Sequence, residues 1–96
     1  MDLQALRHLA GVGVGLPIPL IRKRMVIGRL DSCDIVLKFP DVSDKHCELT
    51  YVDGQWLIRD LQTVNGIRIN GSEVTQAQTL RPGDQIAIAG EIFIYE

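Results

Sequence analysis

Apolar and polar residues alternate along most of this chain with a period of two, which is typical of half-buried β-strands. The alternation is clearest after Lys45, where Cys47, Leu49 and Tyr51 are predicted to face one side and the residues between them the other. Further short apolar runs occupy 18–24, 25–28, 35–39, 55–61, 67–69, 85–89 and 91–96. The pattern therefore predicts many short strands and no convincing helix within these runs.

Turn signals separate these runs at short intervals. Asp53-Gly54 predicts a tight hairpin, because both residues tolerate the positive φ that a two-residue turn requires. Asn65-Gly66 and Asn70-Gly71 bracket a very short strand, and 81–84 (RPGD) forms another turn. Short strands joined in this way predict an all-β protein, an antiparallel sandwich.

The first sixteen residues differ from the rest. Residues 1–10 have a weak helical pattern with Leu3, Leu6 and Ala10 on one side, and the apolar stretch 9–21 is interrupted by prolines and glycines. That stretch is too short to span a membrane and has no basic leader before it. We therefore predict a flexible lead-in over 1–16, a sandwich domain over 17–96, and a cytoplasmic protein.

Charge argues against two classes of partner. The 96 residues carry a formal net charge of −2, so the molecule as a whole attracts neither nucleic acid nor an acidic membrane. The basic run 22–24 (RKR) is expected to be a solvated face, since few aromatic residues are available to stack on bases. Any anion that this protein binds must be held by a local cluster.

The two cysteines, Cys33 and Cys47, are too few for a disulfide framework and lie in apolar surroundings. We expect both to be buried free thiols. Together with His46 they lack the spacing of a zinc site, so no metal and no cofactor is expected. The single tryptophan, Trp56, is expected to anchor the core.

Four polar clusters fall in predicted loops or at strand ends: 28–29, 43–46, 63–66 and 70–71. Loops at one end of a sandwich can converge on a ligand. Arginine has a planar fork of donors that suits phosphate, and Ser, Thr and Asn add short neutral donors and acceptors. Ser43 and His46 could also suggest a nucleophile and its base, but side chains three apart at a strand start should diverge.

The order Gly-Arg, Ser-x-x-His, Asn-Gly, Asn-Gly, together with "CDIVL" and "HCEL", resembles the forkhead-associated (FHA) domain over 17–96. The resemblance implies a sandwich of two twisted sheets, no catalytic activity, and loops at one end that bind phosphothreonine in a partner protein linked to Ser/Thr kinase signalling. It implies that Arg29 and Ser43 hold the phosphate and that Asn65 binds the peptide backbone. Structural roles are implied for Gly28, His46, Gly66 and Asn70.

The chain departs from the family at two positions. Asp44 stands where a cation or amide is common, and Val64 where a hydroxyl is common. Lys45 and Thr63 are the candidates to replace the missing phosphate contacts, and the backbone N–H of Val64 can serve the peptide. The alternative is a phosphate-independent interaction or assembly domain with a degraded site. Acidic residues near the site predict a preference for basic or neutral peptide flanks: Asp31, Asp34 and Asp41.

Overall fold

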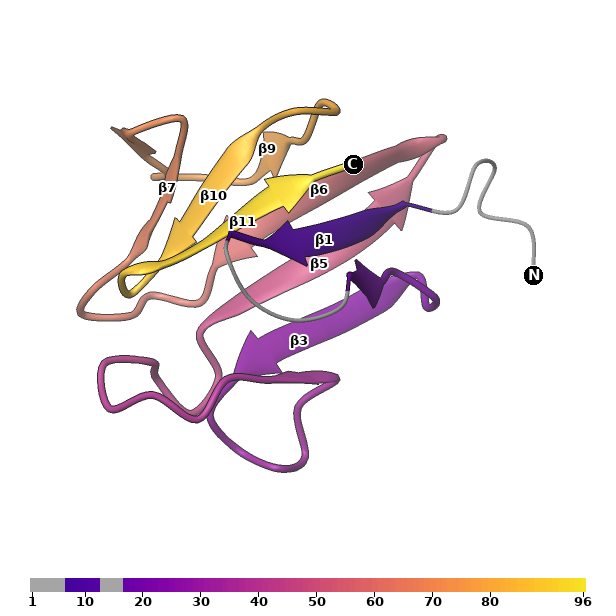
Figure 1. Ribbon diagram of the computed structural model, residues 1–96. Coiled ribbons are helices and arrows are strands. Elements are labelled where there is room, and N and C mark those ends of the chain that lie inside the picture. Colours follow the sequence, from indigo (N-terminus) through magenta and orange to yellow (C-terminus); the bar gives the residue numbers. More distant parts are fainter. Residues whose placement is uncertain (1–6, 13–16) are drawn as a thin grey trace.

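The computed structural model describes residues 7–12 and 17–96, which form two β-sheets packed face to face (Figure 1). One sheet has the strand order β2-β1-β11-β10-β7-β8, and the other has the order β4-β3-β5-β6-β9. The strands are β1 (His8–Gly11), β2 (Ile18–Pro19), β3 (Arg24–Gly28), β4 (Ile35–Val36), β5 (Cys47–Val52), β6 (Gln55–Asp60), β7 (Ile67–Ile69), β8 (Ser72–Glu73), β9 (Gln78–Thr79), β10 (Gln85–Ile88) and β11 (Glu91–Tyr95). The described residues contain no helix, so the predicted all-β sandwich is confirmed.

The core lies between the two sheets, where the inward side chains of both interdigitate. Leu49 and Ile58 from one sheet and Ile86 and Ile88 from the other are fully buried. Trp56 is 1 % exposed and belongs to the same cluster, as predicted. Each such side chain contributes about 1.5–3 kcal/mol by leaving water, and this burial fixes the strand register because a one-residue slip would expose every apolar side chain.

Three two-residue turns use left-handed backbone. Asp53-Gly54 joins β5 to β6 and Asn70-Gly71 joins β7 to β8, with φ of 50° and 80°, and 52° and 86°, respectively. Both were expected from their sequence. The turn between β10 and β11 is Ala89-Gly90, with φ of 49° and 88°. No turn was expected there, because alanine rarely adopts this conformation.

Two features of the fold differ from the sequence-based prediction. Residues 8–11 form strand β1, which pairs with β11 in the register Leu9↔Tyr95. The sandwich therefore begins before residue 17, and residues 7–10 are not helical; the remainder of the predicted helix, residues 1–6, lies outside the described residues. Strand β1 covers the edge that β11 would otherwise expose, and Leu9 is 1 % exposed. Strand β4 pairs parallel to β3, so that sheet is mixed rather than purely antiparallel.

The two ends of the sandwich are separated by the length of β5 and β6. Cys47 pairs with Asp60 at one end and Val52 with Gln55 at the other. Six residues per strand place these ends roughly 20 Å apart. In Figure 1 the long loops that flank β4 lie at the first end, far from the β5–β6 turn. Within the described part of the chain, no helix is long and apolar enough to cross a membrane.

Candidate functional site

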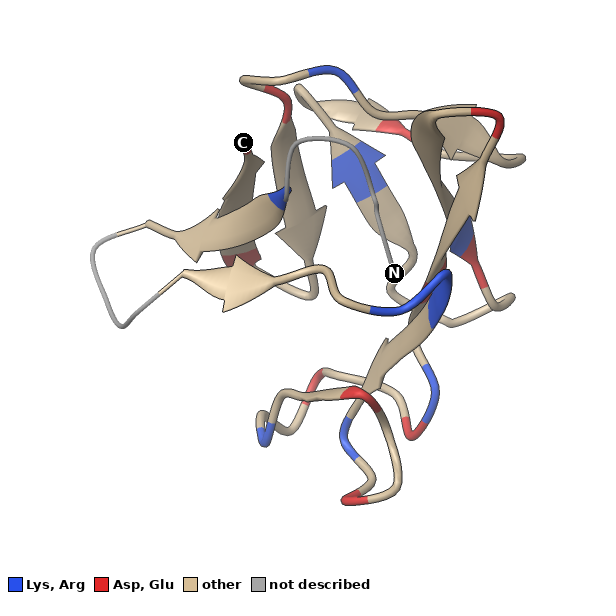
Figure 2. Cartoon of the chain, turned by 90° about the vertical axis from the view of Figure 1, so that its right-hand side faces the viewer, with Lys and Arg blue, Asp and Glu red and all other residues tan. Residues whose placement is uncertain are grey.

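Three loops meet at the end of the sandwich where β5 begins. They connect β3 to β4 (29–34), β4 to β5 (37–46) and β6 to β7 (61–66). Figure 2 shows that the two loops around β4 carry both positive and negative residues. The loops contain all the predicted ligand-binding residues: Arg29, Ser43, Lys45, Thr63, Val64 and Asn65. The predicted convergence of these segments at one end is therefore present in the fold.

Gly28 sets the spacing between the first two loops. A Cβ atom at this position would collide with the carbonyl oxygen of Asp44 and would lie 2.9 Å from Sγ of Cys33. With no side chain there, the loops pack closely, and the backbone N–H of Arg29 donates to the carbonyl oxygen of Ser43 at 3.0 Å. Cys33 adds a bond from its thiol to the Asp44 carbonyl oxygen at 3.2 Å. The first two predicted phosphate ligands are thus held next to each other by backbone contacts.

Within residues 7–12 and 17–96, the guanidinium of Arg29 is held by long contacts. Its Nη2 lies 3.5 Å from Oδ1 of Asp44, and its Nη1 lies 3.4 Å from the carbonyl oxygen of Pro40. The side chains of Arg29 and Asp44 are 46 % and 63 % exposed. Ion pairs between exposed groups contribute about 0–1 kcal/mol. A ligand with a stronger charge can therefore displace Asp44 from the guanidinium at small cost.

His46 connects the second loop to the third. Its ring is fully buried. Nδ1 accepts a hydrogen bond from the backbone N–H of Ser43 at 3.1 Å, so Nε2 carries the proton and donates to the carbonyl oxygen of Gly66 at 2.8 Å. Gly66 has a φ of 65°, which turns this carbonyl toward the ring. The imidazole braces the loop that carries Ser43 against the loop that carries Asn65.

These contacts also decide against the nucleophile interpretation of Ser43 and His46. A general base must have a free ring nitrogen within hydrogen-bond reach of the hydroxyl. Both ring nitrogens of His46 are bonded to backbone groups, and the bond to Ser43 goes to its N–H rather than to its hydroxyl. The pair therefore has a structural arrangement rather than a catalytic one.

Thr63 occupies the interior of the third loop. Its hydroxyl donates to Oδ1 of Asp60 at 2.7 Å and accepts from the N–H of Gly66 at 3.0 Å. Its own N–H donates to Oδ2 of Asp60 at 3.0 Å. Since the hydroxyl proton is bonded to Asp60, Thr63 is not positioned to donate to a phosphate. The sequence assigned Thr63 to the ligand and gave no role to Asp60, the residue that bonds it.

Asn65 lies at the surface where the second and third loops meet. Its Nδ2 donates to the carbonyl oxygen of Asp41 at 2.8 Å, which fixes the amide plane beside the loop of Ser43. Val64, next to it, is 100 % exposed. Lys45 is exposed and forms no ion pair among the described residues. The contacts that Lys45 and Val64 were predicted to make with a ligand stay predictions.

Asn70 lies away from these loops, in the β7–β8 turn. Its Oδ1 accepts from the N–H of Gln85 at 2.9 Å and its Nδ2 donates to Asp84 at 3.0 Å. These bonds tie the turn to the start of β10. The structural role predicted for Asn70 therefore has a physical basis outside the ligand loops.

Two of the acidic residues near the site are engaged by cations. Asp31 lies 2.6 Å from Nζ of Lys38, and Asp34 lies 3.0 Å from Nη1 of Arg22. The second carboxylate oxygen of Asp34 accepts from the N–H of Val26 at 2.8 Å. Asp34 is thus part of the edge of β3, and the negative charge left to face a ligand is that of Asp41 and Asp44.

No group of metal-ligating side chains was found in the part of the chain that the structure describes. Both cysteines are free and buried, as predicted. Burial raises the pKa of the Cys47 thiol far above its usual range, with a smaller contribution from the charge of Asp60. Cys47 is therefore a neutral packing group rather than a metal ligand or a nucleophile.

Residues 25–89 match the family described as "FHA domain". The match covers more than half of the chain, which therefore belongs to the FHA domain family, a family of binding modules. The relatives agree. The transcriptional regulatory protein EmbR of Mycobacterium tuberculosis is 32 % identical over 93 residues, 97 % of this chain and 24 % of EmbR. The FHA domain-containing protein FhaB of the same organism is 30 % identical over 78 residues, 81 % of this chain and 50 % of FhaB.

Solved structures give the same result. Mycobacterium tuberculosis EmbR, solved in complex with a low-affinity phosphopeptide, superposes with a TM-score of 0.93 over 97 % of this chain and 24 % of that chain, at 32 % identity. An FHA domain solved in a study of phosphothreonine-dependent interactions has a TM-score of 0.88 at 27 % identity, covering 96 % of both chains. The chain spans about a quarter of EmbR and half of FhaB.

Proposed function

We propose that the three loops around Arg29 bind a phosphothreonine-containing segment of a partner protein. The observation that carries this proposal is the placement of Arg29 and Ser43 on adjacent loops, joined by a backbone hydrogen bond of 3.0 Å. A planar guanidinium and a hydroxyl on neighbouring loops provide donors from two directions to one phosphate. Membership of the FHA family and the phosphopeptide complex of EmbR support the same assignment.

In this proposal the guanidinium of Arg29 leaves Asp44 and forms charge-assisted hydrogen bonds with the phosphate oxygens. A phosphate carries a charge of about −1.5 to −2 at neutral pH, so it competes well with a single carboxylate. The bonds from Arg29 to Asp44 and Pro40 are 3.5 and 3.4 Å long, which is beyond the usual length of strong hydrogen bonds. The site is therefore prepared for exchange of one anion for another.

Ser43 supplies the hydroxyl on the opposite side of the phosphate. Its backbone N–H is bonded to His46 at 3.1 Å, so the side chain rather than the N–H is available to the ligand. The buried imidazole holds the position of Ser43, which lowers the ordering cost on binding.

Asn65 orients the peptide. Its amide nitrogen is bonded to the Asp41 carbonyl oxygen at 2.8 Å, and this leaves the amide oxygen to accept from a backbone N–H of an extended peptide. A bond to the peptide backbone beside the phosphothreonine sets the direction of the chain across the loops. We assign Thr63 to the support of this loop through Asp60, and we keep Lys45 and the N–H of Val64 as further ligand contacts.

The energetics are compatible with a micromolar complex, which requires about 8 kcal/mol. Charge-assisted hydrogen bonds contribute about 1.5–3 kcal/mol each, and Arg29, Ser43 and a few backbone contacts supply several of them. The charge of Asp44 opposes the ligand by about 1 kcal/mol at an exposed site. Moderate affinity is expected, with a preference for basic or neutral flanks because Asp41 and Asp44 remain near the peptide.

The partner would be a substrate of a Ser/Thr kinase, and the domain would act as a targeting or scaffolding part of a signalling protein without catalytic activity. Two buried free thiols suit the reducing conditions of the cytoplasm, where we place the protein. Nucleic acid and membrane are not proposed as partners, because the net charge of −2 attracts neither.

A titration followed by amide NMR tests this function. A degenerate phosphothreonine peptide library should shift the signals of Arg29, Ser43 and Asn65, while the unphosphorylated library should leave them in place. Absence of any response of these signals to the phosphorylated library would overturn the proposal. Addition of a phosphoserine library distinguishes a general phosphate site from one that also reads the threonine methyl group.

A second candidate is a phosphate-independent interaction domain. The contact of 3.5 Å between Asp44 and Arg29 favours it, because the acid already occupies one side of the guanidinium. Such a domain would bind partners through exposed strand edges. Its signature is partner binding that is unchanged in Arg29→Ala, whereas the leading proposal requires that this variant bind its partner more weakly.

A further inference from the structure

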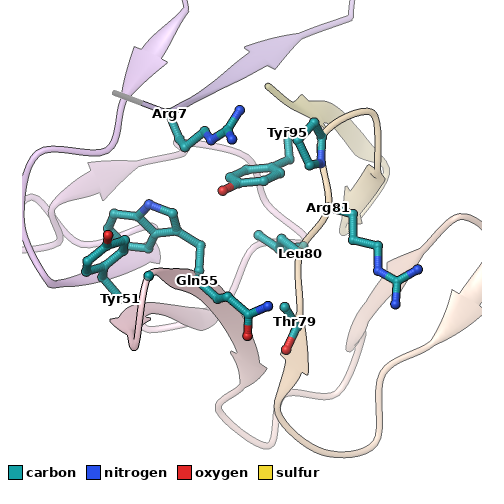
Figure 3. A pocket seen from close by; sticks show the side chains of 10 residues that line it. Arg7, Tyr51, Gln55, Thr79, Leu80, Arg81 and Tyr95 are labelled. Atoms are coloured by element: carbon teal, nitrogen blue, oxygen red, sulfur yellow. The ribbon is translucent and has the colours of Figure 1, made fainter. Parts of the chain in front are cut away.

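A polar cavity of about 350 Å³ lies at the end of the sandwich opposite the Arg29 loops. It is bordered by the β5–β6 turn at Gly54, by the segment 79–82 that leads from β9 toward β10, and by the end of β11 at Tyr95. Figure 3 shows side chains that line it, which come from these three parts of the chain and from Arg7, just before β1. Because β5 and β6 span the distance between the ends, this cavity is roughly 20 Å from the proposed phosphate site.

Two arginines supply positive charge to this cavity. Arg7 and Arg81 both line it, and neither guanidinium forms an ion pair with any acid in residues 7–12 or 17–96. Asp84 bonds the backbone N–H of Arg81 at 2.8 Å, not its guanidinium, and Glu96 is bonded to His8 at 2.8 Å. Other arginines of the fold pair with acids, as Arg22 does with Asp34 and Arg24 does with Glu48. Two arginines at one cavity that lack such a pair are therefore a distinct feature.

Aromatic side chains form the walls. The rings of Tyr51 and Trp56 have centroids 5.4 Å apart, and the guanidinium carbon of Arg7 lies 6.0 Å from the centroid of Tyr95. Burial raises the pKa of Tyr95 above its ordinary value even though the charge of Arg7 acts to lower it. Its phenol is therefore protonated at neutral pH and can donate a hydrogen bond.

Trp56 adds a donor that has no acceptor. Its indole Nε1 is buried, and no hydrogen-bond partner for it occurs within the described residues. Buried polar groups are bonded in the great majority of cases, and an unbonded one carries a cost. A ligand that brings an acceptor to this N–H, after a small shift of the side chains that cover it, would remove that cost.

The arrangement of the charges indicates the kind of ligand. In Figure 3 the guanidinium of Arg7 lies beside Tyr95, whereas that of Arg81 lies on the other side of Tyr95 and extends away from it. One compact anion cannot use both cations when they diverge in this way, whereas successive acidic side chains on an extended peptide can each meet one. The aromatic walls then cover the aliphatic parts of those side chains.

We propose that this cavity is a second binding site that takes a carboxylate-rich segment of a partner protein, with Arg7 and Arg81 holding separate acidic side chains. It acts independently of the phosphate loops, which lie at the other end of both long strands. A partner with a phosphothreonine and a distant acidic segment would then contact both ends of the domain, and the linked contacts would raise the affinity for that partner.

The only tryptophan of the chain reports on this site directly, because it gives a single indole N–H signal in an NMR spectrum of ¹⁵N-labelled protein. The probe is the peptide acetyl-Glu-Glu-Glu-amide, and its matched control is acetyl-Gln-Gln-Gln-amide. The acidic peptide should shift the indole signal in a saturable way, and the neutral peptide should not. The amide signals of Arg29 and Ser43 should stay in place during this titration.

Arg81→Gln and Arg7→Gln should each weaken binding of the acidic peptide about five-fold, through the loss of one ion pair at a solvent-accessible site. Arg68→Gln is the control, since Arg68 is exposed on β7 outside the cavity. An indole signal that does not respond, or that responds equally to both peptides, overturns the proposal. So does inorganic phosphate that shifts the signal at lower concentration than the peptide, or equal affinity in both cavity variants and the control.

Discussion

The carbonyl oxygen of Asp44 packs against the Cα atom of Gly28, at a distance that leaves no room for a side chain. This contact joins the loop that begins with Arg29 to the loop that carries Ser43, and the bond from Arg29 N–H to the Ser43 carbonyl oxygen follows directly from it. The glycine of the Gly-Arg pair is thus a packing requirement, and the arginine depends on it for its position.

Gly28→Ala should therefore disturb both stability and ligand binding. The new methyl group forces the Asp44 carbonyl outward, and overpacking of this kind costs about 1–3 kcal/mol. Urea unfolding should show that loss in the free energy of unfolding, and the affinity for a phosphothreonine peptide should fall at temperatures where the variant remains folded. A folded variant with unchanged affinity would contradict the proposed dependence of Arg29 on this contact.

His46→Ala tests the brace between the second and third loops. The change leaves the N–H of Ser43 and the carbonyl oxygen of Gly66 without partners and creates a cavity, so the free energy of unfolding should fall by about 2–4 kcal/mol. Hydrogen exchange of the Ser43 amide should accelerate by more than that of amides in β10. If Ser43 exchanges at the same rate in both proteins, the imidazole does not hold this loop.

Asp44→Asn should strengthen phosphothreonine binding about five-fold, because it removes a competing and repelling charge worth about 1 kcal/mol at an exposed site. Isothermal titration with one peptide measures the change. The matched control is Asp31→Asn, since Asp31 is already paired with Lys38 at 2.6 Å and should matter little. Unchanged or weaker binding by the Asp44 variant would show that the acid does not oppose the ligand.

Cys47 makes the protein sensitive to alkali. Burial raises the pKa of its thiol above the ordinary value of 9.0, so above pH 9 the unfolded chain releases a proton that the folded chain keeps. The unfolded state is favoured in that range, and the free energy of unfolding should fall by up to about 1.4 kcal/mol per pH unit from this group. Below pH 9 the contribution is constant. In Cys47→Ala the free energy of unfolding should fall less steeply with pH above pH 9. An identical slope in the variant and the wild-type protein would contradict this assignment.

The sequence predicted those parts of the fold that depend on local patterns. Alternation at Cys47, Leu49 and Tyr51, and the turn at Asp53-Gly54, are properties of neighbouring residues, and both are present. Strand β1 was missed because its partner, β11, lies more than eighty residues later. Pairing at such separation leaves no local pattern beyond a short apolar run, and glycines follow it.

In the functional site too, the features that follow local sequence motifs were predicted, and those that depend on tertiary contacts were not. The sequence order of the motifs singled out Arg29, Ser43 and Asn65 as ligand-binding candidates. All three lie on loops at one end of the sandwich. The role of Thr63 was not predictable, because its hydroxyl bonds to Asp60, at the end of a strand that looked purely structural. A short Asp-x-x-Thr spacing after a strand is the signal that could have indicated this bond. The run 35–39 was predicted as a strand, but the parallel pairing of β4 with β3, beside which Asp34 meets Arg22, has no local sequence pattern.

The most direct test compares the wild-type protein with Arg29→Ala in calorimetric titrations against one phosphothreonine peptide selected from the library, with Arg68→Ala as the control. Loss of charge-assisted bonds from the guanidinium should weaken binding by at least about ten-fold in the Arg29 variant and leave the control unchanged. The same peptide without its phosphate should bind neither protein. Equal affinity of wild type and Arg29→Ala for the phosphopeptide would contradict the account.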